Sequence, residues 1–344
     1  MDEIVLPRPD DLHLHLRDGE ALRVTVPATA RQFGRAVAMP NLKPPVTTVD
    51  AALAYRERIL AHVPEGLRFA PLMTLYLTDA TPPDEVRRAK DAGVIGVKLY
   101  PAGATTHSDA GVSQLDALDD TLAAMAEVGL PLLVHGEVTD HEVDIFDREA
   151  VFIDTVAGPL LQRHPTLRFV FEHATTADAV AFVRGFGDGR VGCTITPQHL
   201  LMNRGALFDG GLRPHHYCLP VLKRERHRVA LLEAATSGDA RFFLGTDSAP
   251  HLRGAKESSC GCAGCFSAPY ALELYAMAFE RAGALERLAG FASRHGAAFY
   301  GLPVAEEQVR LVREEVVVEA RLDYPGGEIV PLWAGERLPW RFVG

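Results

Sequence analysis

Several features of membrane and secreted proteins are missing from this sequence. No apolar stretch reaches the ~20 residues that a membrane-spanning helix requires. The first residues, MDEIVLPRPDD, are acidic and lack the basic and apolar segments of a signal peptide. The chain has five cysteines, an odd number, and three of them crowd into CGCAGC, which does not suit a disulfide framework. We therefore expect a cytoplasmic protein that does not act on a membrane.

Clusters of basic residues are missing as well. The formal net charge of the 344 residues is -10. A protein that binds nucleic acid usually presents a basic face, so we expect no nucleic-acid partner. An acidic surface still permits a local cationic pocket, and an anionic small molecule remains a possible substrate.

What the sequence does contain is a series of short apolar runs that alternate with helix-like stretches. Their continuous hydrophobicity, as in VIGVKLY, is typical of parallel strands covered on both faces. The pattern predicts an α/β fold, a (β/α)₈ TIM-type barrel that forms a single domain over residues 1–344. Residues 305–344 are expected as an appended C-terminal segment of short strands and turns. The eight expected strands cover residues 10–16, 35–39, 68–77, 94–100, 131–135, 168–173, 190–196 and 241–247.

One helix has clear boundary signals. Thr81 can cap it, Pro82 suits its first turn, and Gly93 follows its last turn.

Potential metal ligands recur where the apolar runs end. His13 and His15 lie two positions apart on an expected strand, so both side chains point to the same face. A lone histidine is usually a core imidazole bonded to the backbone. Histidines at the ends of several strands instead favour metal ligands around one barrel mouth, as a metal-dependent hydrolase requires. The candidate metal ligands are His13, His15, Lys98, His135, His173 and Asp247.

Lys98 lies in an apolar strand, where a charged ammonium is costly to bury. A neutral amine there could react with carbon dioxide to give a carbamate that bridges two metals. There are two other interpretations of Lys98: it could form an ion pair with a carboxylate, or it could be the Schiff-base lysine of an aldolase. The surrounding histidines favour the bridge, because a Schiff-base site needs no such set of ligands.

Asp247 is the candidate catalytic residue. In GTDSAPH, after the last barrel strand, its carboxylate could bind a metal and take a proton from bound water. For an isolated aspartate, capping of a following helix would be the ordinary interpretation.

Polar groups that could bind a substrate lie near the same strand ends. Arg17, Asn41 and His251 could together hold an anionic substrate. Thr105 and Thr106, in the loop after Lys98, could bind a ligand when that loop closes. CGCAGC offers three thiols and no obvious fourth ligand, so we interpret it as a glycine-rich loop near the substrate, not as a zinc knuckle.

Motifs along most of the chain resemble those of dihydroorotases of the single-domain bacterial type, within the amidohydrolase superfamily. They are DLHLHLRDG, AMPNLKPP, GVKLYPAGATT, LLVHGE, FEHATT, YCLPVLKR and GTDSAPH followed by KESSCGCAGCF. The HxH pair indicates only the superfamily, whereas HLRDG combined with KESSCGCAGCF is far more specific.

The resemblance implies a binuclear site and a reaction. Two divalent metals, usually zinc, would be bridged by carbamylated Lys98, and backbone groups of Leu219 and Ala263 would contact the pyrimidine ring. Arg17, Asn41 and His251 would hold the substrate carboxylate, and the protein would be a homodimer. The implied reaction is the reversible cyclisation of N-carbamoyl-L-aspartate to L-dihydroorotate, the third step of pyrimidine synthesis, through a metal-bridged hydroxide.

Two further functions are compatible with the same residues. Another cyclic-amide hydrolase, such as a hydantoinase or allantoinase, could share the metal ligands without the clamp formed by Arg17, Asn41 and His251. A non-catalytic barrel that serves as a scaffold is less compatible, because no candidate ligand is missing from the motifs.

Overall fold

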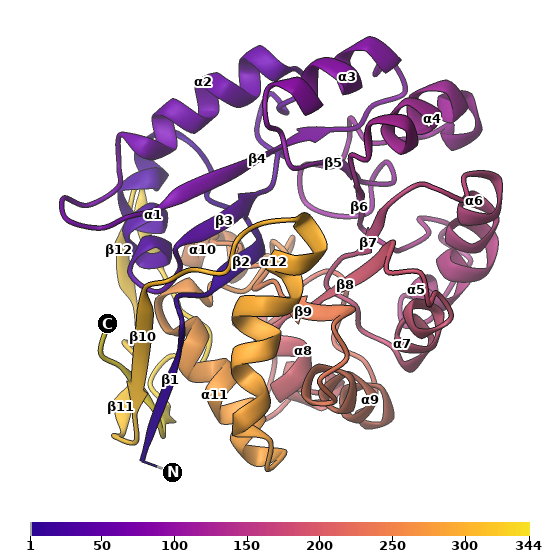
Figure 1. The fold of residues 1–344 in the computed structure, drawn as a ribbon. Coiled ribbons are helices and arrows are strands. Elements are labelled where there is room, and N and C mark those ends of the chain that lie inside the picture. Colours follow the sequence, from indigo (N-terminus) through magenta and orange to yellow (C-terminus); the bar gives the residue numbers. More distant parts are fainter. Residues whose placement is uncertain (1) are drawn as a thin grey trace.

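The computed structural model describes residues 2–344 and contains a sheet of eight parallel strands arranged as a barrel (Figure 1). Neighbours in the sheet are also neighbours in the chain, so the predicted barrel of βα units is confirmed. The barrel strands are β2 (Asp10–Leu14), β3 (Arg35–Ala38), β4 (Ala70–Tyr76), β5 (Gly96–Leu99), β6 (Leu132–Val134), β7 (Phe169–Phe171), β8 (Val191–Ile195) and β9 (Phe242–Leu244).

The barrel closes through the residues that follow β9. The Asp247 N–H donates to the His13 carbonyl at 2.8 Å, and the His15 N–H donates to the Ser248 carbonyl at 2.9 Å. The Asp11 carboxylate, in β2, accepts from the Thr246 N–H at 2.9 Å. The two edges of the sheet therefore meet at the place where His13, His15 and Asp247 were predicted to meet.

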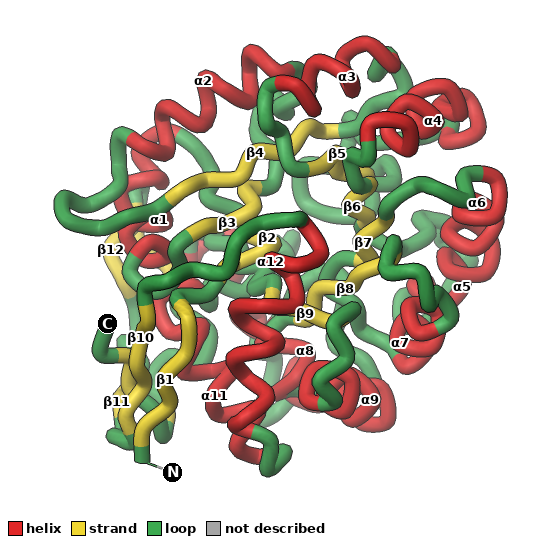
Figure 2. The backbone as a smooth tube through the Cα atoms, viewed as in Figure 1, coloured by secondary structure: helices red, strands yellow, loops and turns green. Residues whose placement is uncertain are grey.

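Helices surround the strands on the outside of the barrel, as Figure 2 shows. The segment from α5 to α6 is continuous, because a π-helical turn over Ile153–Ala157 joins the two. The helices are α1 (Leu22–Ala30), α2 (Val49–Leu60), α3 (Pro83–Asp91), α4 (Asp119–Val128), α5 (Arg148–Phe152), α6 (Gly158–Arg163), α7 (Ala177–Arg184), α8 (Pro197–Leu201), α9 (Glu225–Thr236), α10 (Arg253–Lys256), α11 (Ala271–Arg281) and α12 (His295–Tyr300).

The predicted cap of the helix after β4 is wrong by one residue. Helix α3 begins at Pro83 with Pro82 as its cap, and no side chain bonds to the helix start. Thr81 Oγ1 instead accepts from the Thr78 N–H at 2.9 Å. Two consecutive prolines explain the difference, because Pro83 disfavours the helical conformation at the residue before it, and Pro82 is accordingly extended with a ψ of 153°.

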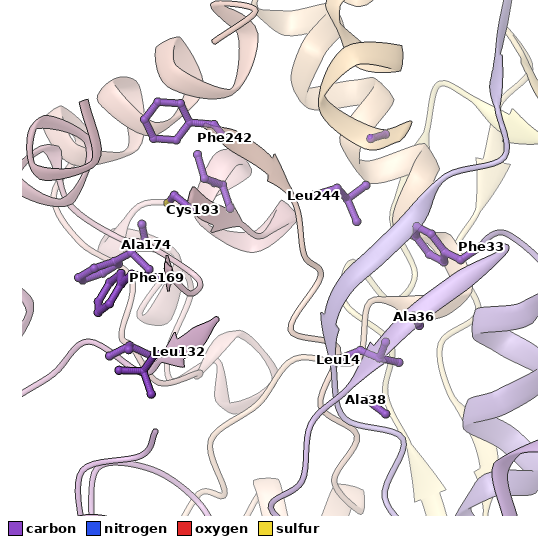
Figure 3. Packing of buried hydrophobic residues seen from close by; sticks show 14 of the residues in the cluster. Leu14, Phe33, Ala36, Ala38, Leu132, Phe169, Ala174, Cys193, Phe242 and Leu244 are labelled. Atoms are coloured by element: carbon purple, nitrogen blue, oxygen red, sulfur yellow. The ribbon is translucent and has the colours of Figure 1, made fainter. Parts of the chain in front are cut away.

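Alternate residues of the barrel strands pack in opposite directions. Leu132, Phe169 and Phe242 belong to the large cluster between strands and helices (Figure 3). Their neighbours in the chain, such as Leu133 and Val170, belong to a separate buried cluster that we assign to the barrel interior. Burial on both faces explains why these strands are apolar throughout.

Short antiparallel strands occupy both ends of the chain. β1 (Glu3–Pro7) pairs with β10 (Gln308–Val312), and β10 pairs with β15 (Arg341–Phe342). Two further pairs join β11 (Val316–Val317) to β14 (Arg337–Leu338) and β12 (Leu322–Tyr324) to β13 (Gly327–Ile329). The sequence predicted strands after residue 305 but not their partner at the N-terminus. Between residues 2 and 344, no helix has the length and hydrophobicity needed to cross a membrane.

Candidate active site and metal centre

Three predicted ligands form a compact buried group. Asp247 Oδ1 lies 3.4 Å from His13 Nε2 and 3.0 Å from His15 Nε2. One ligand atom from each residue lies within 4.8 Å of the others. Two imidazoles and a carboxylate at this spacing fit a divalent cation such as zinc.

Partners behind the two histidines fix which ring nitrogen faces the group. His13 Nδ1 donates to Glu172 Oε2 at 2.9 Å, and His15 Nδ1 donates to Asn41 Oδ1 at 2.7 Å. Each Nε2 is therefore left to face Asp247. Such outer partners orient a metal-binding imidazole and raise its basicity.

His135, His173 and Lys98 extend the group across the barrel. The His173 ring centroid lies 4.9 Å from that of His13 and 4.8 Å from that of His135. His135 Nε2 donates to Glu137 Oε2 at 2.9 Å, which leaves Nδ1 as its free nitrogen. Burial and the nearby Lys98 ammonium both lower the pKa of His173, so the structure places all six candidate ligands in one neighbourhood.

The sequence predicted every candidate ligand within a strand, but in the structure some of them lie just beyond a strand end. His13 and Lys98 belong to β2 and β5, but His135 follows β6 by one residue, and His173 follows β7 by two. Asp247 lies three residues beyond β9. The strand ladders end early because the chain turns there toward the barrel mouth.

The electrostatics of Lys98 suit a reactive amine. Burial lowers the pKa of Lys98 to about 8, although the Glu172 and Asp247 carboxylates oppose this shift. Lys98 Nζ, His13 Nε2 and His173 Nδ1 are buried and have no hydrogen-bond partner within residues 2–344. Buried polar atoms are almost always satisfied. The donor set and these atoms therefore fit bound divalent metal and a carboxylated lysine.

A small cavity lies over the ligand group and contains most of the predicted substrate residues. Because Arg17 is among them, the cavity has a cationic wall beside the ligands. The lining residues are His15, Arg17, Asn41, Tyr100, Thr105, Thr106, His135, His173, Leu219, Asp247, Ala249, Ala263 and Gly264.

Two predicted substrate residues make contacts within the protein. His251 does not line the cavity; its Nε2 accepts from Arg17 Nη2 at 2.9 Å. Arg17 Nε also donates to the Pro250 carbonyl at 3.2 Å. Asn41 Nδ2 donates to the Thr106 carbonyl at 3.2 Å, so Asn41 joins the His15 ligand to the loop that carries Thr106.

Comparison with known proteins places the chain in a family. The sequence model of the amidohydrolase family matches residues 4–305. The chain belongs to the amidohydrolases.

Relatives of this amidohydrolase share its full length. A dihydroorotase of Halorhodospira halophila is 63% identical over 344 residues and 99% of each chain. The crystal structure of a dihydroorotase from Campylobacter jejuni has a TM-score of 0.91 at 36% identity, covering 99% of this chain and 98% of that one. A Saccharomyces cerevisiae dihydroorotase, in complex with 5-fluoroorotic acid, has a TM-score of 0.91 at 32% identity, covering 100% and 99%. The resemblance drawn from the motifs is thereby confirmed.

The sequence analysis missed residues that hydrogen-bond to the candidate ligands of this amidohydrolase. Glu172 Oε2 also accepts from Thr194 Oγ1 at 2.5 Å, so it links β8 to the His13 ligand. Glu137 supports His135, and Tyr100 lines the cavity with a buried hydroxyl that has no partner within residues 2–344. A signal for the two glutamates was present, because each lies within two residues of a ligand histidine, in FEH and HGE.

Proposed function

We propose that this amidohydrolase is a dihydroorotase, which interconverts N-carbamoyl-L-aspartate and L-dihydroorotate in pyrimidine biosynthesis. The observation that carries the proposal is a half-buried guanidinium, that of Arg17, in the same cavity as the group of candidate ligands. A cyclic amide that bears a carboxylate matches both features, since arginine binds carboxylates through paired hydrogen bonds. Identity of 63% along the whole length of a dihydroorotase supports the same substrate.

The proposed cofactors are two zinc ions. His13, His15 and Asp247 would hold one, His135 and His173 the other, and a carboxyl group on Lys98 Nζ would join them. When bound, such ions polarise a carbonyl and lower the pKa of bound water from 15.7 toward ~7. The lowered pKa of Lys98 supports its carboxylation, because only the neutral amine reacts with carbon dioxide.

Asp247 is proposed as the residue that moves the proton. Burial disfavours its charge, but the adjacent His13 and His15 side chains outweigh burial and hold the pKa of Asp247 well below its usual value. The ionised carboxylate can accept a proton from the attacking water as the ring amide opens. It then delivers this proton to the departing ring nitrogen, so that the C–N bond breaks without forming an amide anion. In ring closure the same steps run backwards, and water is lost.

The remaining cavity residues are proposed to orient the substrate. Arg17 holds the substrate carboxylate, and His251 restrains the guanidinium from behind. Asn41 fixes His15 and reaches the loop at residues 101–111, where Thr105 and Thr106 face the cavity.

The proposed setting is a homodimer in the cytoplasm. All five cysteines are free, which suits a reducing compartment. Phe208 and Leu212 are 61% and 82% exposed between α8 and α9, and an isologous contact there would cover both. Light scattering at increasing concentration, with Leu212→Asp for comparison, tests this assembly.

A direct assay tests the activity. Purified, metal-analysed protein is given dihydroorotate and carbamoyl aspartate, with hydantoin and allantoin alongside. Turnover of dihydroorotate that disappears on metal removal and returns with zinc is the expected result. Turnover of hydantoin or allantoin alone would assign a different cyclic-amide hydrolase.

A further inference from the structure

Lys256 is a buried lysine outside the ligand group. It ends α10, and only 3% of its surface is exposed. Its Nζ donates to the Tyr217 carbonyl at 2.8 Å and to the Gly264 carbonyl at 2.6 Å. Within residues 2–344 it forms no ion pair with a carboxylate. The ammonium therefore joins two backbone segments and does not neutralise an acid.

The two segments form one wall of the cavity. Leu219 lies two residues after Tyr217, and Ala263 precedes Gly264; both Leu219 and Ala263 line the cavity. The Tyr217 carbonyl also accepts from the Gly264 N–H at 3.0 Å. Three hydrogen bonds thus set the spacing between the backbone around Leu219 and the backbone around Ala263.

The same cavity wall is hydrogen-bonded to the segment that follows β9 and contains Asp247. The Ala249 N–H donates to the Cys265 carbonyl at 2.8 Å. Gly264 has a φ of +147° there, and a Cβ at this position would lie 2.7 Å from the Ala249 carbonyl oxygen. The backbone at Gly264 is therefore restrained twice. It packs closely against Ala249, and its carbonyl accepts a hydrogen bond from Lys256.

We propose that Lys256 is a positioning residue, whose ammonium holds the backbone groups of Leu219 and Ala263 at the spacing that binds the amide edge of a cyclic substrate. This inference rests on the proposed function, because it takes the ring of dihydroorotate as the ligand. Lys256 itself does not touch the substrate. Its contribution is to binding, so its loss should raise KM and leave kcat and metal content nearly unchanged.

The test compares Lys256→Met with Lys90→Met. Methionine keeps most of the side-chain volume and removes the donors, and Lys90 is an exposed lysine in α3. For Lys256→Met we expect KM for dihydroorotate to rise about tenfold or more, with kcat within about twofold of wild type. Hydrogen exchange should become faster in residues 214–220 and 260–266. Lys90→Met should match wild type in each measurement.

Other outcomes overturn the inference. An unchanged KM in folded Lys256→Met would refute it, and so would a fall in kcat and zinc content at constant KM. If Lys256→Met does not fold, Lys256→Gln replaces it, because its amide is polar but one atom too short to bond both the Tyr217 and the Gly264 carbonyls; a KM equal to that of wild type refutes the inference there. Failure of the wild-type protein to turn over dihydroorotate would refute the proposed function instead, and the two failures are therefore distinct.

Discussion

Replacing Glu172 with glutamine tests whether the residues behind the ligands set the metal affinity. Glu172 is fully buried, and its Oε2 accepts from His13 Nδ1 at 2.9 Å and from Thr194 Oγ1 at 2.5 Å. Glutamine keeps the shape and one acceptor oxygen but removes the charge. His13 would then be oriented by a neutral hydrogen bond, and its Nε2 would be a weaker ligand.

The size of the effect follows from the hydrogen bonds that change. A hydrogen bond to a charged group contributes about 1.5–3 kcal/mol, against about 0.5–1.5 kcal/mol for a neutral one. The difference of roughly 1–1.5 kcal/mol corresponds to about a tenfold loss of zinc affinity at the site that contains His13. Measured effects of such outer partners are about ten- to a hundredfold, so this is the lower end of the expected range.

Competition with a chromophoric zinc chelator measures this affinity, and Glu273→Gln is the matched control. Glu273 is also buried, in α11, and accepts from Gln32 Nε2 at 2.7 Å and from the Phe342 N–H at 3.2 Å. Both substitutions should lower the free energy of unfolding, but only Glu172→Gln should weaken zinc binding. Wild-type affinity in Glu172→Gln, or an equal loss in both variants, would refute the reasoning.

Three other predictions concern the substrate, the lysine and the packing. Arg17→Ala should raise KM for dihydroorotate by about a hundredfold, because the charged pair between the half-buried guanidinium and the substrate carboxylate is lost. Zinc content by mass spectrometry should be unchanged, and unaltered kinetics would exclude the clamp. With the Lys98 pKa at about 8, the neutral fraction grows about tenfold from pH 6 to pH 7. Zinc uptake by metal-free protein at constant dissolved carbon dioxide should accelerate accordingly, and a flat profile would count against carboxylation. Gly136→Ala would place a Cβ 2.3 Å from Phe171 Cζ, so urea denaturation should show a loss of about 1–3 kcal/mol.

The barrel could be predicted from the sequence because its signal is local. Eight apolar runs were expected, and each contains an observed strand, although the runs overshoot the strands at their ends. Apolar side chains continue past the last paired residue, so hydrophobicity alone cannot locate the end of a ladder. The pairing of β1 with β10 could not be predicted, because Glu3 and Val312 are partners that no short pattern connects.

The sequence predicts that the candidate ligands meet, but it does not identify the residues that hydrogen-bond to them. Ligand residues such as His13 and His15 stand at fixed positions relative to strand ends, so their meeting follows from the barrel. Glu172 meets His13 across 159 positions, and only the three-dimensional structure identifies this contact. The same holds for Lys256, whose partners are backbone carbonyls that the side-chain sequence does not specify.

The backbone conformation of the ligands explains why the prediction overshot the strands. Within residues 2–344, five non-glycine residues have positive φ, and His173 at 40°, Asp247 at 46° and Arg17 at 62° are three of them. Such conformations cost roughly 1–3 kcal/mol each and persist only where surrounding contacts hold them. Here the His173 N–H donates to Thr194 Oγ1 at 2.7 Å, and the Asp247 N–H donates to the His13 carbonyl at 2.8 Å. After β7 and β9 the chain leaves the strand geometry at residues that turn into the barrel mouth, so the ends of these two ladders and the placement of His173 and Asp247 have the same cause.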